Sequence, residues 1–209
     1  MAPNPINSPQ RFKNAEAGFS LLELLVVAAL LIILSATYLS HSSKDFQRSK
    51  QVECANQLQF IHSSLQMYAT DHGGQYPKTN SATTSEQPLS LLIPTATTRT
   101  ELFICPGTRD STLPAGRPFA SGKISYAYLM GLTNGSDPGQ WIMADALYTN
   151  APAKIGSPVY SQDGKGRGRN HAKFGGNVLF LDGHTTRSAP LASFDLPQPP
   201  GTQILNPKR

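Results

Sequence analysis

The segment FSLLELLVVAALLIILSATYL, from Phe19 to Leu39, dominates the sequence and is its strongest indication of fold. Its central part, Leu24 to Leu34, contains only apolar residues. A helix of about 20 apolar residues crosses the ~30 Å hydrocarbon layer of a bilayer, whereas a helix on a soluble core shows a polar face. We therefore predict a transmembrane helix over residues 19–40.

A secretory signal peptide is the alternative interpretation of this segment. Arg11 and Lys13 would form its basic region, and residues 35–37 its cleavage site. The apolar run is long beside the roughly 7–15 residues of a signal peptide. Glu23 lies at the start of the run, and an ionisable side chain inside a membrane is costly and usually functional. We therefore favour a helix that is retained.

Residues 18–23 read GFSLLE and resemble the type IV prepilin signal. In that family a membrane peptidase cuts after the glycine, on the cytoplasmic side. The new N-terminal residue is methylated, and a glutamate at the fifth mature position stays in the membrane. The resemblance implies cleavage after Gly18, methylation of Phe19 and a role for Glu23 in assembly. Glu23 of a neighbouring subunit would pair with the Phe19 amine, because pairing makes a carboxylate tolerable at low dielectric.

The same resemblance implies partners and a location. The partners are prepilin peptidase, copies of the chain, other pilins or pseudopilins, the inner-membrane assembly machinery and the lipid bilayer. The location is the bacterial inner membrane, crossed once, with the C-terminal head in the periplasm. Basic residues flank the apolar segment on both sides. The positive-inside rule therefore does not settle the orientation, which rests on the resemblance.

The helix is predicted to continue beyond the membrane through residues 41–74. Residues 42–70 contain no proline or glycine, and apolar residues recur every three or four positions. This predicted stripe consists of Val52, Ala55, Leu58, Ile61, Leu65 and Tyr68. Gly73-Gly74 and Pro77 end the pattern, and we interpret Asp71 and His72 as part of a helix-ending turn. The stretch from Cys54 to Pro77 also resembles G-type pseudopilins of type II secretion. That resemblance implies an α+β fold, with a long N-terminal helix packed on a small antiparallel β head.

Residues 75–189 are predicted to form the head. Residues 78–100 are rich in serine and threonine and indicate a loop with an apolar patch at residues 89–93. Residues 123–130 and 140–147 are expected to be the two strands of a hairpin, because turn-forming residues separate them. Residues 1–18 are the expected leader. The proline-rich residues 190–209 are expected to be extended or disordered.

Two cysteines, Cys54 and Cys105, lie far apart in the sequence and match no local zinc-binding pattern. In the oxidising compartment that the resemblance implies, we predict a disulfide between them. It would close a loop of about 50 residues, which the chain-entropy model values at roughly 4 kcal/mol. Two buried free thiols are the alternative.

Residues 167–187, RGRNHAKFGGNVLFLDGHTTR, are the second informative region. A strand over residues 177–181 and an Asp-Gly turn predict a hairpin. The region resembles the H-X9-DG motif found at the C-terminus of many prepilin-like proteins, with one residue more in its spacer. The matching positions are His171, Asn177, Asp182, Gly183 and His184.

A structural role is favoured for this C-terminal motif. Asp182 is expected to serve the turn, and His171 to cap a loop through backbone hydrogen bonds. The longer spacer argues against a fixed contact between these two side chains. Ligand binding is the next alternative, and no metal is assigned. Calcium prefers oxygen ligands, so Asp145, Asp163 and Asp182 are its candidates, although a structural role is favoured for Asp145.

Lysine and arginine total 18 against 13 acidic residues, a formal net charge of +5. Four of the basic residues lie in one loop, at Lys165, Arg167, Arg169 and Lys173. Phe174 is the one aromatic residue beside them, so stacking on bases is not expected. We favour a solvated loop over contact with nucleic acid or lipid headgroups.

Together these patterns favour a structural subunit of a type II secretion pseudopilus or a related filament. The alternative is a minor pilin at a pilus tip that binds DNA or a surface. A membrane-anchored enzyme is less favoured, because the sequence contains no nucleophile elbow, HExxH motif or phosphate loop. No catalytic residue is assigned, and calcium is the one cofactor considered.

Overall fold

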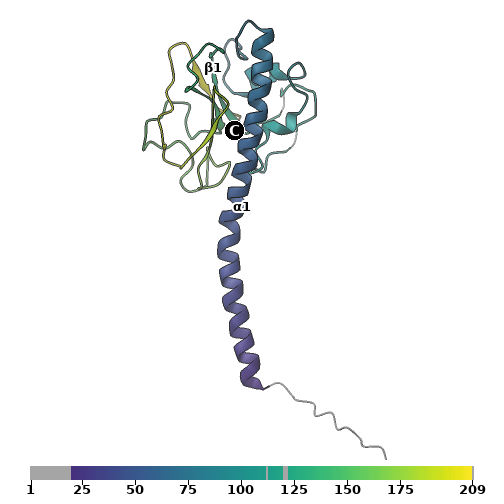
Figure 1. Ribbon diagram of the computed structural model, residues 1–209, viewed down its shortest axis with the longest axis vertical. Helices are drawn as coiled ribbons and strands as arrows, with labels where there is room; N and C mark the ends of the chain where they lie inside the picture. The colour runs from purple at the N-terminus through teal and green to yellow at the C-terminus, as the bar shows by residue number, and fades with distance from the viewer. Residues whose placement is uncertain (1–19, 112, 120–121, 209) are drawn as a thin grey trace, which may run out of the picture. The chain divides into compact units, whose positions relative to one another are not determined.

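The computed structural model describes residues 20–111, 113–119 and 122–208, and for residues 38–44 it describes the backbone alone. The chain divides into two compact units, Met1–Ser43 and Lys44–Arg209. We describe each unit by itself and call the second one the head. The first helix, α1, comprises Leu21–Asp71, so its bounds lie close to the predicted ones (Figure 1).

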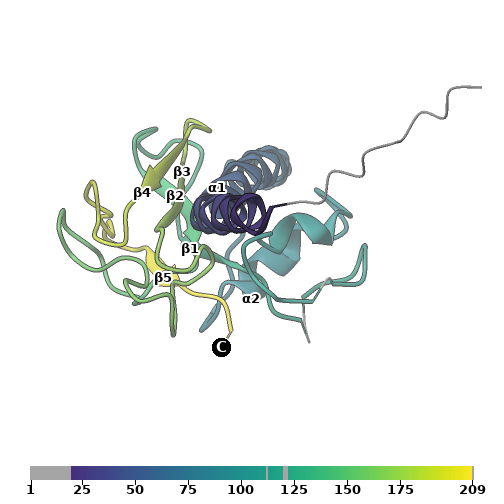
Figure 2. The same cartoon turned by 90° about the horizontal axis from the view of Figure 1, so that it is seen from below.

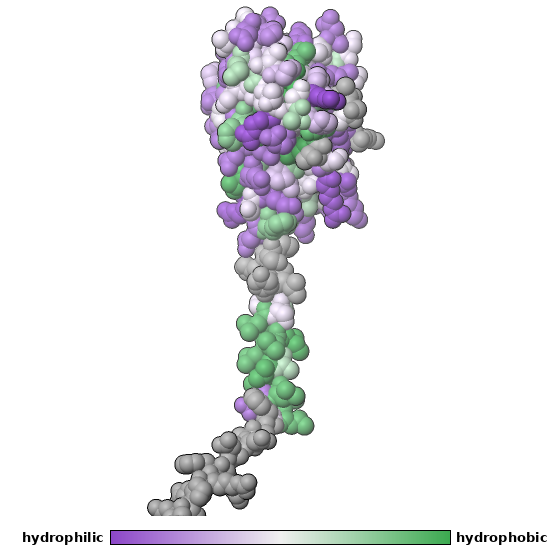
Figure 3. Space-filling model, turned by 90° about the vertical axis from the view of Figure 1, so that its right-hand side faces the viewer, coloured by the Kyte–Doolittle hydropathy of each residue, from purple (hydrophilic) through white to green (hydrophobic). Residues whose placement is uncertain are grey.

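The N-terminal unit contains the apolar part of α1. Side chains from Leu21 to Leu34 are exposed, and the large apolar ones expose between 45% and 81% of their surface. Figure 3 shows apolar side chains gathered on this part of the helix. Glu23 lies among them, in the first turn. A negative side chain is favourable there, because the unpaired backbone N–H groups make the helix start electropositive.

The head is built on a five-stranded antiparallel sheet with the strand order β4-β3-β2-β1-β5 (Figure 2). The strands are β1 (Tyr126–Met130), β2 (Trp141–Asp145), β3 (Gly176–Phe180), β4 (Thr185–Ser188) and β5 (Gln203–Leu205). The hairpins predicted over residues 123–147 and 177–187 are confirmed as β1–β2 and β3–β4. Every residue of the two central strands β1 and β2 is buried.

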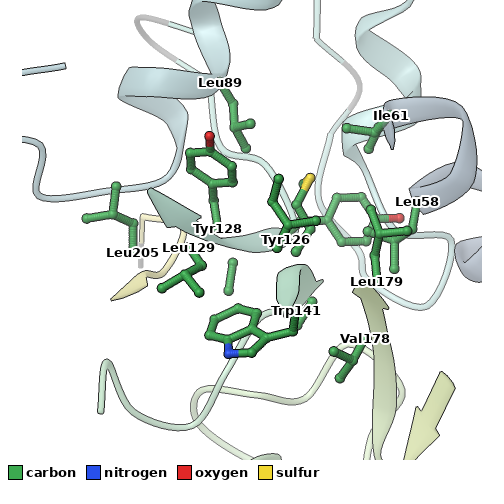
Figure 4. Close-up of a cluster of buried hydrophobic side chains, with 14 of the residues drawn as sticks. Leu58, Ile61, Leu89, Tyr126, Tyr128, Leu129, Trp141, Val178, Leu179 and Leu205 are labelled. Carbon is green, nitrogen blue, oxygen red and sulfur yellow. The ribbon is translucent and has the colours of Figure 1, made fainter. Parts of the chain in front are cut away.

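The C-terminal part of α1 packs on this sheet and completes the core. Leu58, Ile61 and Leu65 are fully buried, and Figure 4 shows the first two close to Tyr126 and Leu179. The α+β fold with a long helix on a small antiparallel sheet is thereby confirmed. The predicted stripe was wrong at Val52, which is half-exposed, because the buried face instead contains Cys54.

The end of α1 agrees with the sequence prediction. The helix ends at Asp71, and the N–H of Gly74 bonds back to the carbonyl oxygen of Ala69 at 2.8 Å. The ring of His72 stacks on Tyr68, with 3.8 Å between the ring centroids. Asp71 and His72 therefore belong to a helix-ending turn.

Two segments differ from their predictions. Residues 78–100 contain short helices where a loop was predicted: α2 (Glu86–Leu89) and η1 (Ser90–Leu92), followed by η2 (Thr100–Phe103). The C-terminal residues are extended and also part of the head, because β5 pairs with β1 and the side chain of Leu205 is fully buried. The boundary expected at residue 190 therefore does not mark the end of the packed head.

Candidate functional site

The predicted processing site lies outside the described residues, since Gly18 and Phe19 precede residue 20. Glu23, the predicted assembly residue, is the first of these positions that the structure describes. It stands on the exposed first turn of α1.

Four titratable side chains from distant parts of the chain meet inside the head. They are Cys54 on α1, Cys105 after η2, Asp145 at the end of β2, and His171 in the loop before β3. All four residues are fully buried. One sulfur, nitrogen or oxygen atom from each lies within 4.8 Å of those of the other three. We call this group the buried cluster.

Asp145 is held by several donors. One carboxylate oxygen accepts from Asn170 Nδ2 at 2.7 Å and the Cys54 thiol at 3.2 Å. The other accepts from the backbone N–H of Asn177 at 2.8 Å and from its side-chain amide at 3.2 Å. Burial acts to raise the pKa of Asp145, but His171 and these hydrogen bonds outweigh it and lower that pKa. Asp145 is therefore ionised.

His171 contacts two members of the cluster through one ring nitrogen. Its Nε2 lies 3.3 Å from Asp145 Oδ2 and 3.3 Å from Cys105 Sγ. Burial acts to lower the pKa of His171, but the hydrogen bond and charge of Asp145 prevail and raise it to about 10. The other nitrogen, Nδ1, is buried and has no hydrogen-bond partner among the described residues. Without another cation in the cluster, His171 and Asp145 form a buried ion pair.

The two cysteines are free thiols in this structure. Burial raises the pKa of both, and the negative charge of Asp145 adds to the effect. Both are therefore protonated at neutral pH when no cation is bound. Cys105 Sγ also accepts from the N–H of Gly107 at 3.3 Å. The predicted disulfide between Cys54 and Cys105 stays a prediction, with sulfur atoms within 4.8 Å of each other.

The C-terminal motif separates into two parts in space. His171 and Asn177 belong to the buried cluster or border it, and Asn177 Nδ2 also donates to the carbonyl oxygen of Gln51 on α1 at 3.0 Å. Asp182, Gly183 and His184 form the turn between β3 and β4, where the N–H of His184 donates to Asp182 Oδ1 at 3.0 Å. The turn function predicted for Asp182 is confirmed.

The loop-capping role predicted for His171 was wrong. Its described partners are side chains, Cys105 and Asp145, and not backbone carbonyls. The expectation that it makes no contact with Asp182 holds, because Asp182 pairs with the neighbouring His184 instead.

The three candidate calcium ligands do not converge. Asp163 accepts from Ser161 Oγ and the N–H of Lys165 in its own turn, and Asp182 serves the β3–β4 turn. Among the described residues, no cluster suited to a metal contains more than one of these aspartates. Calcium binding stays a prediction without a ligand set in that part of the chain.

A surface pocket of about 990 Å³ lies beside the buried cluster. Its lining includes Gly107, Asn170 and Ala172, which are neighbours of Cys105 and His171 in the sequence. Two residues of the basic loop, Arg167 and Arg169, also line it. Lys165, Arg169 and Lys173 are exposed, in agreement with a solvated loop.

Sequence reasoning did not find the buried cluster as a group. Zinc patterns are recognised by ligands a few residues apart, whereas these four side chains come from four separate elements. The available signal was a single anomaly, the charged Asp145 in an otherwise apolar strand.

Comparison with known families identifies the N-terminal region. Residues 13–39 match the family described as the prokaryotic N-terminal methylation motif. This match supports a type IV prepilin-like N-terminal region, and the motif implies processing by prepilin peptidase and assembly with other pilins. No curated protein and no solved structure matches the chain. The H-X9-DG resemblance stays a prediction.

The methylation motif implies association with a membrane. In the parts of the chain that the structure describes, we find no helix with an apolar stretch sufficient to cross a bilayer.

Proposed function

We propose that the mature protein is a structural, non-catalytic subunit of a type II secretion pseudopilus or a closely related filament. Cleavage after Gly18 makes Phe19 the N-terminus. Subunits then associate through the apolar part of α1, and Glu23 of one pairs with the Phe19 amine of another. The proposal places the apolar N-terminal part of α1 in the bacterial inner membrane and the head on its periplasmic side.

One observation carries the proposal: among the residues that the structure describes, the apolar side chains from Leu21 to Leu34 on α1 are exposed. Leu21, Leu22 and Ile32 are all more than two-thirds exposed. A continuous apolar surface of this kind marks contact with lipid or with other proteins. The residues that match the methylation motif, 13–39, include this apolar surface. The motif favours both kinds of contact, since a prepilin-type helix moves from the membrane into a filament.

Mass spectrometry of the mature N-terminus tests the proposal. The full chain is produced in cells with and without prepilin peptidase, and the membrane fraction is analysed. We expect a chain that begins with N-methylated Phe19 in the first case and an uncut chain in the second. A chain cut near Ala36 and released as soluble protein would show that the segment is a signal peptide and end the proposal.

A further inference from the structure

We propose that the buried cluster is a binding site for one Zn²⁺ ion, with Cys54, Cys105, Asp145 and His171 as its ligands. The proposal concerns the head alone and holds whether or not the chain forms filaments.

The spacing of the four side chains agrees with a tetrahedral ion. Zn²⁺ binds sulfur, nitrogen and oxygen at about 2.0–2.3 Å, which places neighbouring ligand atoms roughly 3.3–3.8 Å apart. In the cluster, His171 Nε2 lies 3.3 Å from both Asp145 Oδ2 and Cys105 Sγ. Cys54 Sγ lies 3.2 Å from Asp145 Oδ1. All four ligand atoms lie within 4.8 Å of one another, so binding would draw one atom of each residue closer around a single ion.

The chemistry of these ligands selects the class of metal. Two thiols and an imidazole are soft or borderline ligands that favour zinc over calcium or magnesium, whose ligands are oxygens. Four protein ligands complete a tetrahedral shell, and a closed shell is typical of structural zinc rather than catalytic zinc. The full burial of all four residues agrees with a structural role.

Binding requires a change of protonation that the site can accommodate. Both thiols and the protonated His171 ring each lose one proton to solvent, three in all, and His171 binds as the neutral imidazole through Nε2. Two thiolates and one carboxylate then carry three negative charges against two on the ion. The ion replaces the positive charge of protonated His171 as the partner of Asp145, so no carboxylate is left unpaired.

Neighbouring groups hold the ligands in place, as they do around known metal centres. Asn170 and Asn177 donate to the Asp145 carboxylate. The N–H of Gly107 points at Cys105 Sγ, and the hydroxyl of Tyr126 lies 3.4 Å from Cys54 Sγ. The hydrogen bond from Gly107 stabilises the Cys105 thiolate that zinc requires, whereas the Tyr126 hydroxyl donates to Gln57 Oε1 at 2.7 Å.

The site would fasten α1 to the rest of the head. Cys54 comes from the helix, Asp145 from the end of the middle strand β2, and the other two ligands from separate loops. A bound ion would thus link the same two segments as the predicted disulfide, without oxidation. The two states exclude each other, because a thiol in a disulfide has no thiolate to offer.

Metal analysis and cobalt substitution test the proposal on the full chain, purified in detergent without chelator. We expect one zinc ion per chain and two thiols that resist alkylation until a strong chelator is added. Co²⁺ should replace the zinc and give the visible bands of tetrahedral cobalt together with a thiolate charge-transfer band. Thermal unfolding should shift to lower temperature after chelation.

Two variants sharpen the test. Cys105→Ser should lose the zinc and the charge-transfer intensity, whereas His184→Ala, a change at the exposed histidine of the C-terminal motif, should retain both. If Cys105→Ser does not fold, the cobalt spectrum of the unaltered chain determines whether the site binds a tetrahedral metal ion. A folded, metal-free chain that stays colourless with Co²⁺, or one whose cysteines form a disulfide, overturns the proposal.

Discussion

At the scale of single residues, Gly176 shows how closely the head is packed around the buried cluster. It lies in β3, and a side-chain carbon at this position would stand 2.6 Å from the ring of Tyr160 and 2.9 Å from the Cβ of Asp145. We expect Gly176→Ala to lower the free energy of unfolding by about 1–3 kcal/mol, because overpacking displaces buried neighbours. Chemical denaturation of the purified chain measures the loss.

Gly135→Ala is the matched control for this substitution. A side-chain carbon at Gly135 would meet only Thr133 Oγ1, at 3.8 Å, among the neighbouring atoms. We expect its effect to stay within about 0.5 kcal/mol, as for surface substitutions in general. Equal stabilities for the two variants would show that β3 is less tightly packed than described.

The residues of the buried cluster also show where sequence reasoning ends. Asp145 was recognisable as unusual, because a charge in an apolar strand needs a partner. Its partner, His171, was not identifiable, since no local spacing connects the two. Cys54 and Cys105 were expected to form a disulfide because of the chemistry of their compartment. That bond stays a prediction, with the two sulfur atoms within 4.8 Å of each other. Only the fold shows that an acid and a histidine join them.

At the scale of elements, the patterns with a local cause were predictable. The bounds of α1 follow from its apolar periodicity and from the glycines after it, and the hairpins follow from their turn residues. The short helices α2 and η1 and the edge strand β5 were not predicted. Their conformations depend on contacts with distant parts of the chain, such as the pairing of Leu205 with Tyr128 on β1.

The first turn of α1 gives a prediction about assembly. Glu23→Ala should leave processing and membrane association intact, because it removes a charge from an apolar segment. We expect filaments to fall by more than about tenfold, since the loss of one partner from a buried ion pair costs roughly 3–5 kcal/mol. Electron microscopy and immunoblots of sheared filaments measure the effect.

Glu53→Ala is the control for that experiment, because Glu53 is an exposed acid on the same helix within the head. It should assemble normally. Abundant filaments from Glu23→Ala would remove the carboxylate from the assembly mechanism and leave the apolar surface of α1 as the sole basis for packing.

At the scale of the whole molecule, the division into two units predicts that the head is an independent domain. Among the described residues, every member of the hydrophobic core comes from position 54 or later, and the apolar side chains from Leu21 to Leu34 are exposed. A chain that begins at Lys44 should therefore fold, remain soluble and no longer associate with membranes. Its free energy of unfolding should differ from that of the head within the full chain by less than about 1 kcal/mol. The reason is that the truncation removes none of the described core residues.

Circular dichroism, thermal unfolding and membrane fractionation measure these properties, with the full chain in detergent as the reference. A truncated chain that unfolds or aggregates would show that residues before 44 help to form the head. A folded one would assign separate tasks to the two units. The N-terminal unit would supply membrane association and assembly, and the head would be a separately folded domain that contains the buried cluster.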